Sequence, residues 1–299
     1  MAAPQQDHVL GIMLSCAGFT AWAASDACIK WAGETLTSAT VMALSVCCSA
    51  CCTLLLAARS PGGLSKLRTK NPVFHLLRAL VCVVTFYACI EALKHLPLTS
   101  FYMIVFLSPL FIAVLERIVL REGAGLIVAL ATLFGFCGIL VATQAMQQDA
   151  AAEAMAATYY GIAAAIINAL FYSVVVVMTR YARHENNYVL TLWPDALIFP
   201  AALGIMVWQG DYVYSLSGIV LAALSGVFGC AGFMLTNASL RLAPAAIVSP
   251  YHYTQIISGA ILGFLIWRSV PALGVVIGAT MVIAAGLVIF RQSKAAAVA

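Results

Sequence analysis

Charged residues are scarce in this chain. They make up 9% of its 299 residues, whereas hydrophobic residues make up 64%, and the mean hydropathy is +1.02. Soluble domains carry about 25% charged residues, so this composition cannot supply the polar surface of a folded soluble domain. The scarcity of charge therefore excludes a soluble protein and indicates a membrane protein with many spans.

Long polar segments are missing as well, which leaves no room for a soluble catalytic domain. Apolar runs follow one another with only short breaks, and each is long enough for the roughly 20 residues that cross a bilayer. Lipid offers backbone groups no hydrogen-bond partner, so runs of this length predict helices. We therefore expect an all-α membrane protein with ten transmembrane helices, over His8–Ala32, Ser38–Ala58, Pro72–Leu93, Leu98–Leu120, Ala124–Thr143, Thr158–Tyr181, Tyr188–Trp208, Ser217–Leu240, Ala246–Trp267 and Pro271–Phe290.

Catalytic motifs are also absent. No glycine-rich phosphate loop, H-E-x-x-H pair or nucleophile elbow occurs in the sequence. The alternative class, a membrane enzyme acting on lipid, would need His, Asp or Glu residues clustered near one interface. The five histidines are instead scattered, at His8, His75, His95, His184 and His252. We expect no enzyme activity, no cofactor and no nucleic-acid partner.

Basic residues are nearly missing from one set of loops. That set holds only Lys30, Lys94 and Arg268, while Arg78 lies inside the third span. The other set, which includes both tails, holds Arg59, Lys66, Arg68, Lys70, Arg117, Arg121, Arg180, Arg183, Arg241, Arg291 and Lys294. Because Lys and Arg accumulate on the cytoplasmic side, both termini should be cytoplasmic, in an inner (plasma) membrane. The first apolar run lacks the basic start and clean cleavage site of a signal peptide, so it should be retained.

The chain also matches itself. A shift of 150 residues places Trp22 on Tyr172, and a shift of 147 residues places Pro97 on Pro244. Chance matching between two Ala- and Leu-rich segments is the alternative, but nearly one offset serves four helices. The matches predict two repeats, residues 1–147 and 148–299, of five helices each. Because five is odd, the second repeat must be inverted, which is typical of transporters that bind a solute at the midplane between their halves and alternate around it.

Small-residue motifs point to a family. They are Tyr87-Ala88 with Ala92-Leu93, Ser108-Pro109, Arg121-Glu122, Ser249-Pro250, and the glycine pairs Gly135/Gly138 and Gly278/Gly286. With these motifs and its two halves, the chain resembles the drug/metabolite transporter superfamily in its ten-helix EamA form. Arg268-Ser269 departs from the glutamate that often ends the corresponding helix. The YddG-type amino-acid exporters look closest in size. The resemblance implies a secondary transporter, expected as a monomer in membrane lipid, that exports aromatic or neutral amino acids or related small metabolites by alternating access.

Carboxylates inside the spans are candidate functional groups, because burying a charge in lipid is costly. Asp26 and Lys30 lie four residues apart, acid first, which favours a structural ion pair over a substrate contact. Glu91 lies three and four residues before Lys94 and His95, and we likewise expect it to form a structural pair. Asp195 has no charged neighbour on its helix. It needs a partner on another helix, a water-filled cavity or a proton; alternatively, it reaches back to the cytoplasmic interface past a helix break at Pro194.

Aromatic and polar residues at mid-depth complete the predicted site. Helix breaks at Pro109 and Pro250 should free the carbonyl groups of Val105 and Ala246 at the cavity. We expect the first, third, fourth, sixth, eighth and ninth spans to surround the cavity, although each aromatic residue could instead serve packing. An aromatic cavity suits neutral or zwitterionic solutes. The predicted substrate-binding residues are Trp22, Tyr102, Phe106, Asn168, Tyr172, Asp195, His252, Tyr253 and Gln255.

Four cysteines in the second span, Cys47, Cys48, Cys51 and Cys52, invite a metal-binding interpretation. Thiolates without a basic neighbour would be costly in an apolar helix, and cysteine packs well as a small apolar residue. We therefore predict packing and no metal site. Gly259-x3-Gly263 is a small-residue face typical of close helix contact.

Overall fold

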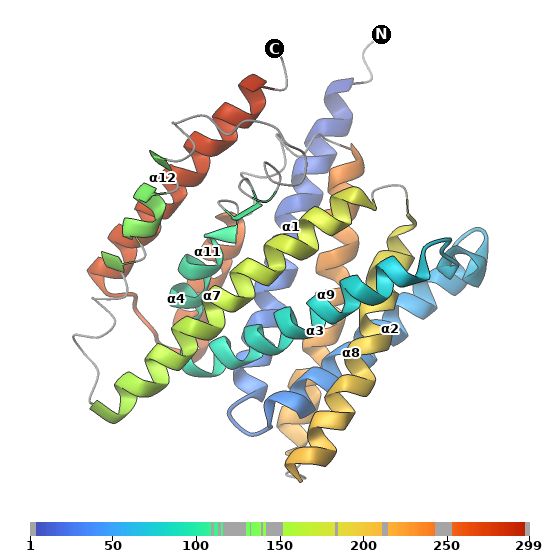
Figure 1. Ribbon diagram of the computed structural model, residues 1–299, viewed down its shortest axis with the longest axis horizontal. Helices are drawn as coiled ribbons and strands as arrows, with labels where there is room; N and C mark the ends of the chain where they lie inside the picture. The colour runs from blue at the N-terminus through green and yellow to red at the C-terminus, as the bar shows by residue number, and fades with distance from the viewer. Residues whose placement is uncertain are drawn as a thin grey trace.

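A computed structural model describes residues 4–108, 111–112, 115, 130–131, 133–138, 140–141, 152–182, 185–210, 215–242 and 253–296. Over these residues the named elements are all helices (Figure 1). They are α1 (Pro4–Ala32), α2 (Ser38–Arg59), a short 3₁₀ helix η1 (Gly63–Leu67), α3 (Pro72–His95), α4 (Leu98–Val105), α7 (Ala152–Tyr181), α8 (Asn187–Gln209), α9 (Leu216–Leu242), α11 (Tyr253–Trp267) and α12 (Leu273–Ala296).

Six of the helices in the described part of the chain are long and apolar enough to cross a membrane. These candidate spans lie in α1, α2, α3, α7, α8 and α9. The predicted boundaries of these six agree with the structure to within a few residues, so the prediction of an all-helical protein with several spans is confirmed. Half of the predicted span 124–143 lies outside the described residues, and the described half is helical. The total of ten and the inverted relation of the halves stay predictions.

The fourth predicted span differs from the structure. It is expected to run from Leu98 to Leu120, whereas α4 ends at Val105 and a turn follows at Phe106 and Leu107. The residues described beyond the turn, 108, 111, 112 and 115, are again helical, and the others up to 120 lie outside the described residues. A proline at position 109 has no N–H for the carbonyl group of Val105, and the Ser108 hydroxyl donates to that carbonyl at 2.5 Å. The carbonyl that the sequence predicted to be free is therefore satisfied locally, beside the turn. Pro109 itself and Pro250 lie outside the described residues.

Small residues bring the helices of the two predicted halves close together. In Figure 1, α1 runs alongside α9, and α2 contacts both α8 and α9. A Cβ added at Gly226 of α9 would lie 2.1 Å from the Ser45 carbonyl oxygen of α2, so only glycine fits there. Ser45 also donates to the Ala222 carbonyl at 3.1 Å. Such contacts replace the hydrophobic effect as the source of helix association in lipid.

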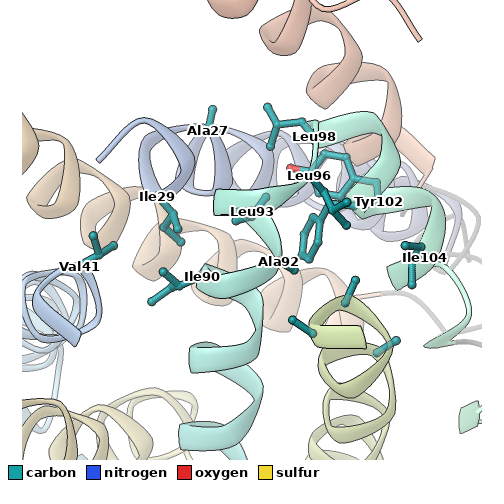
Figure 2. Close-up of a cluster of buried hydrophobic side chains, with 14 of the residues drawn as sticks. Ala27, Ile29, Val41, Ile90, Ala92, Leu93, Leu96, Leu98, Tyr102 and Ile104 are labelled. Atoms are coloured by element: carbon teal, nitrogen blue, oxygen red, sulfur yellow. The ribbon is translucent and has the colours of Figure 1, made fainter. Parts of the chain in front are cut away.

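The corner between α3 and α4 is densely packed. Figure 2 shows Leu93, Leu96 and Tyr102 gathered where one helix leads into the other, and all three are fully buried. Pro97 stands at the start of α4, in the N-cap position. This packing fixes the direction of the Tyr102 ring, which matters for the site described next.

Candidate functional site

A cavity of about 210 Å³ lies between α1, α2, α3, α4, α7, α8, α9 and α11, so both predicted halves contribute to its wall. The six spans expected to line it all do so. The second and seventh spans, α2 and α8, line it as well, although the sequence did not predict their contribution. The wall is mostly apolar, and its aromatic members are Phe19, Trp22, Phe86, Phe101, Phe106, Tyr172 and Phe233.

One wall residue is a buried carboxyl group, Asp26 of α1, which is 5% exposed. Its Oδ2 atom accepts a hydrogen bond from the Tyr102 hydroxyl at 2.9 Å and another from Gln255 Nε2 at 3.0 Å. Both donors are neutral, and they come from α4 and α11. Gly259 of α11 lies against the Tyr102 ring, because an added Cβ would be 2.0 Å from its Cε2 atom. Three helices thus hold the Asp26 carboxylate in place at the cavity.

The predicted ion pair between Asp26 and Lys30 is wrong. No ion pair within 4.0 Å joins these two described side chains; instead Lys30 Nζ donates to the carbonyl oxygens of Leu93 and Leu96, both at 2.9 Å. These carbonyls belong to the C-terminal end of α3, where the last carbonyl groups lack helical partners and attract cations. The local spacing of Asp26 and Lys30 could not reveal this competing partner on another helix.

The expectation for Glu91 holds in part. Its carboxylate lies 3.9 Å from His95 Nε2, one turn along α3. Lys94, the other expected partner, donates instead to the Ser38 hydroxyl at 3.4 Å. Glu91 is thus a structural residue near a helix end.

Asp195 of α8 is the second carboxyl group on the cavity wall, and it is 7% exposed. Its Oδ2 atom accepts a hydrogen bond from the Ser49 hydroxyl of α2 at 2.7 Å. Helix α8 runs without a break through Pro194. The alternative in which Asp195 reaches back to the interface past a break at Pro194 is therefore wrong, and the partner on another helix is found.

Arg78 of α3, to which the sequence analysis gave no role, lies near Asp195. It is 1% exposed, and it donates from Nη1 to the Leu190 carbonyl at 2.8 Å and from Nε to the Thr179 hydroxyl at 3.2 Å. Its charge attracts that of Asp195, but no ion pair within 4.0 Å joins the two described side chains. A basic residue in the middle of an apolar span was the signal that could have identified Arg78.

Most of the predicted site residues meet at this cavity. Trp22, Phe106, Asn168, Tyr172, Asp195 and Gln255 all line it. The Asn168 amide donates to the Thr85 carbonyl at 2.9 Å, and the Trp22 ring packs edge-on against Phe233 with centroids 4.7 Å apart. Whether these residues bind a solute stays a prediction.

Tyr102 differs from the expectation, because it is fully buried and supports Asp26 from behind the wall. Tyr253 begins α11, but its side chain is outside the described part of the chain, as is the whole of His252.

Helices of membrane-spanning length surround a cavity with polar groups at its wall, which is the architecture of a multi-span membrane protein with an internal binding site. The profile of the EamA-like transporter family matches this chain twice, over residues 9–144 and 159–291. The chain therefore belongs to the EamA-like transporter family, as the small-residue motifs had suggested. The predicted division between residues 147 and 148 falls between the two matched segments.

Curated relatives cover most of the chain. A riboflavin transporter of Rhizobium johnstonii is 25% identical over 77% of this chain and 74% of its own length. An S-adenosylmethionine uptake transporter of Rickettsia felis is 24% identical over 78% and 77%, respectively. A solved crystal structure shares the fold, with a TM-score of 0.63, 17% identity, and coverage of 93% of this chain and 95% of that chain. The protein is thus a multi-span membrane transporter and not an enzyme. The relatives' names give no support to amino-acid export.

Proposed function

We propose that this protein is a secondary transporter that carries a small organic cation with a planar ring by alternating access. The observation that carries the proposal is Asp26. It is a buried carboxyl group on the cavity wall, its hydrogen-bond donors are both neutral, and the nearest lysine along its helix is engaged elsewhere. A buried carboxylate is costly unless a positive charge compensates it. A cationic substrate supplies that charge.

The aromatic wall supports the same substrate class. The faces of tryptophan, tyrosine and phenylalanine rings attract cations and stack on other planar rings. The sequence alone favoured neutral or zwitterionic solutes because the predicted cavity was aromatic and weakly charged. With Asp26 and Asp195 both on the wall, positive charge on the solute becomes the better match.

The size of the cavity limits the solute in this conformation. Ligand pockets usually hold about 300–1,000 Å³, whereas this one holds about 210 Å³. A compound the size of an aromatic amine fits more readily than one the size of riboflavin, for which the helices would have to separate. S-adenosylmethionine, which a relative is named for, has the positive charge but is also large.

Amino-acid export remains the specific proposal from the sequence, and an aromatic amino acid carries both an ammonium group and a ring. Its carboxylate would oppose the negative charge of the wall, so we rank it below a solute with net positive charge. An alternating-access carrier works in either direction, and the solute gradient sets the direction of net transport.

Counterflow into liposomes that contain the purified protein tests the proposal. The labelled solutes are tryptamine and S-adenosylmethionine as cations, tryptophan as a zwitterion and riboflavin as a neutral ring compound. We expect tryptamine to exchange fastest, because it is a cation and small enough for the cavity. Asp26→Asn should weaken its apparent affinity about ten- to a hundred-fold, because a charge-assisted hydrogen bond contributes about 1.5–3 kcal/mol. Exchange of riboflavin alone, unaffected by Asp26→Asn, would overturn the proposal.

A further inference from the structure

Two cationic side chains near the cavity, the half-buried Lys30 and the buried Arg78, both donate to backbone carbonyl groups, and neither forms an ion pair with a described carboxylate. Lys30 binds the end of α3 through Leu93 and Leu96, and Arg78 binds the Leu190 carbonyl inside α8. A carbonyl in the middle of a helix normally accepts the N–H of the residue four positions later. The Leu190 carbonyl is therefore an unusual acceptor, and its availability needs a cause.

Pro194 is that cause. It stands four residues after Leu190 within the continuous helix α8, and proline has no N–H to donate. The freed carbonyl would otherwise be an unsatisfied buried acceptor, and Arg78 Nη1 occupies it at 2.8 Å. Asp195 follows directly in the sequence, attracted to Arg78 but held by Ser49 instead. The proline thus gives the arginine a partner other than the neighbouring carboxylate.

We propose that Pro194 is a specificity-determining residue that keeps the Asp195 carboxylate available to a cationic solute by binding Arg78 to the backbone. With an N–H at position 194, the Leu190 carbonyl would be satisfied within α8, and Arg78 would lose its strongest acceptor. The guanidinium would then turn to Asp195, for which a bidentate pair is favourable. This pairing would neutralise the negative charge of Asp195 at the cavity wall, although both carboxyl groups would still be present. This inference rests on the proposed function, because it concerns the charge preference of the same cavity.

The same helix offers a matched control. Pro200 also lies inside α8 and also lacks an N–H, which frees the carbonyl of Ala196. No described side chain donates to that carbonyl, and Pro200 is exposed, whereas Pro194 is buried. Replacing either proline with alanine restores one helical hydrogen bond. Only at position 194 would the new N–H compete with a cationic side chain, Arg78, for the carbonyl oxygen.

The experiment measures binding of two ligands that differ only in charge to the purified full-length protein. Tryptamine carries an ammonium group, and tryptophol carries a hydroxyl group in its place. We expect Pro194→Ala to weaken tryptamine about tenfold and to leave tryptophol within about twofold. Pro200→Ala should change neither. On an Asp195→Asn background, Pro194→Ala should have no further effect on tryptamine, since both changes remove the same charge.

A second variant does not depend on changing the proline. Arg78→Gln keeps a donor for the Leu190 carbonyl but removes the positive charge, so tryptamine should bind more tightly and tryptophol equally well. If Pro194→Ala weakens both ligands alike, or adds fully to Asp195→Asn, Pro194 serves packing only and the inference is wrong. If the unaltered protein binds tryptamine no better than tryptophol, the proposed function fails, and this inference fails with it.

Discussion

At the scale of single residues, the site depends on side chains that never touch the cavity. Tyr102 is fully buried, yet its hydroxyl holds the Asp26 carboxylate at the wall. Its ring has room only because position 259 lacks a side chain. Changes behind the wall should therefore alter the binding of a cation as directly as changes on the wall itself.

Two glycines one turn apart on α11 allow this to be tested. In Gly259→Ala the new methyl group would meet the Tyr102 ring at 2.0 Å, whereas in Gly263→Ala the nearest atom, Leu98 Cβ, is 4.0 Å away. We expect Gly259→Ala to weaken the apparent affinity for tryptamine in counterflow by at least as much as Tyr102→Phe does, about three- to tenfold. Gly263→Ala should leave it unchanged. Equal effects of the two alanines would show that Tyr102 does not position Asp26.

At the scale of helices, local pattern predicted most of the fold. Apolar runs of spanning length gave the bounds of α2, α3 and α8 closely, because hydropathy and turn residues are local properties. Three of the aromatic residues on the wall, Trp22, Phe106 and Tyr172, were predicted from their position toward mid-depth of their spans, whereas Phe19, Phe86, Phe101 and Phe233 were not predicted. Repeat matches and prolines also selected six of the eight helices that surround the cavity.

Contacts between distant helices could not be predicted in this way. The pairing rule for residues four apart assigned Lys30 to Asp26, because it considers a single helix. The partner that Lys30 uses is the end of α3, more than 60 residues along the chain. Arg78 was missed for a similar reason: its acceptor, the Leu190 carbonyl, is exposed only by a proline on another helix. A proline four residues later marks such a freed carbonyl in the sequence, but nothing in the sequence shows which distant side chain donates to it.

At the scale of the whole molecule, the cavity lies between helices of the two predicted halves, and small residues allow these helices to pack closely. α9 contacts both α1 and α2, through positions such as Gly226, where a side chain would strike the backbone of the facing helix. The proposed alternating access would require these helices to move relative to one another around the cavity. The inverted order that the sequence predicts for the halves would make the two end states similar.

The orientation in the membrane is tested with reporter fusions. The distribution of Lys and Arg predicts that a reporter after Gln148 lies outside the cell and that one after Lys294 lies in the cytoplasm. An enzyme active only in the periplasm and a fluorescent protein that matures only in the cytoplasm should give opposite signals at the two positions. The same signal at both positions would contradict the predicted number of spans between them.

The two cysteines on the cavity wall, Cys82 and Cys89 of α3, make the native protein open to chemical inhibition. A small uncharged thiol reagent that enters with the solute would attach a group inside a space of about 210 Å³, and the attached group would block it. We expect N-ethylmaleimide to inhibit counterflow progressively, tryptamine to slow the inhibition, and the Cys82→Ala/Cys89→Ala protein to resist it. Cys47 and Cys51, exposed on α2, would react without consequence. Covalent modification of these thiols would thus give a way to block the transporter, and a ligand that protects them would be identified as an occupant of the cavity before any transport assay is available.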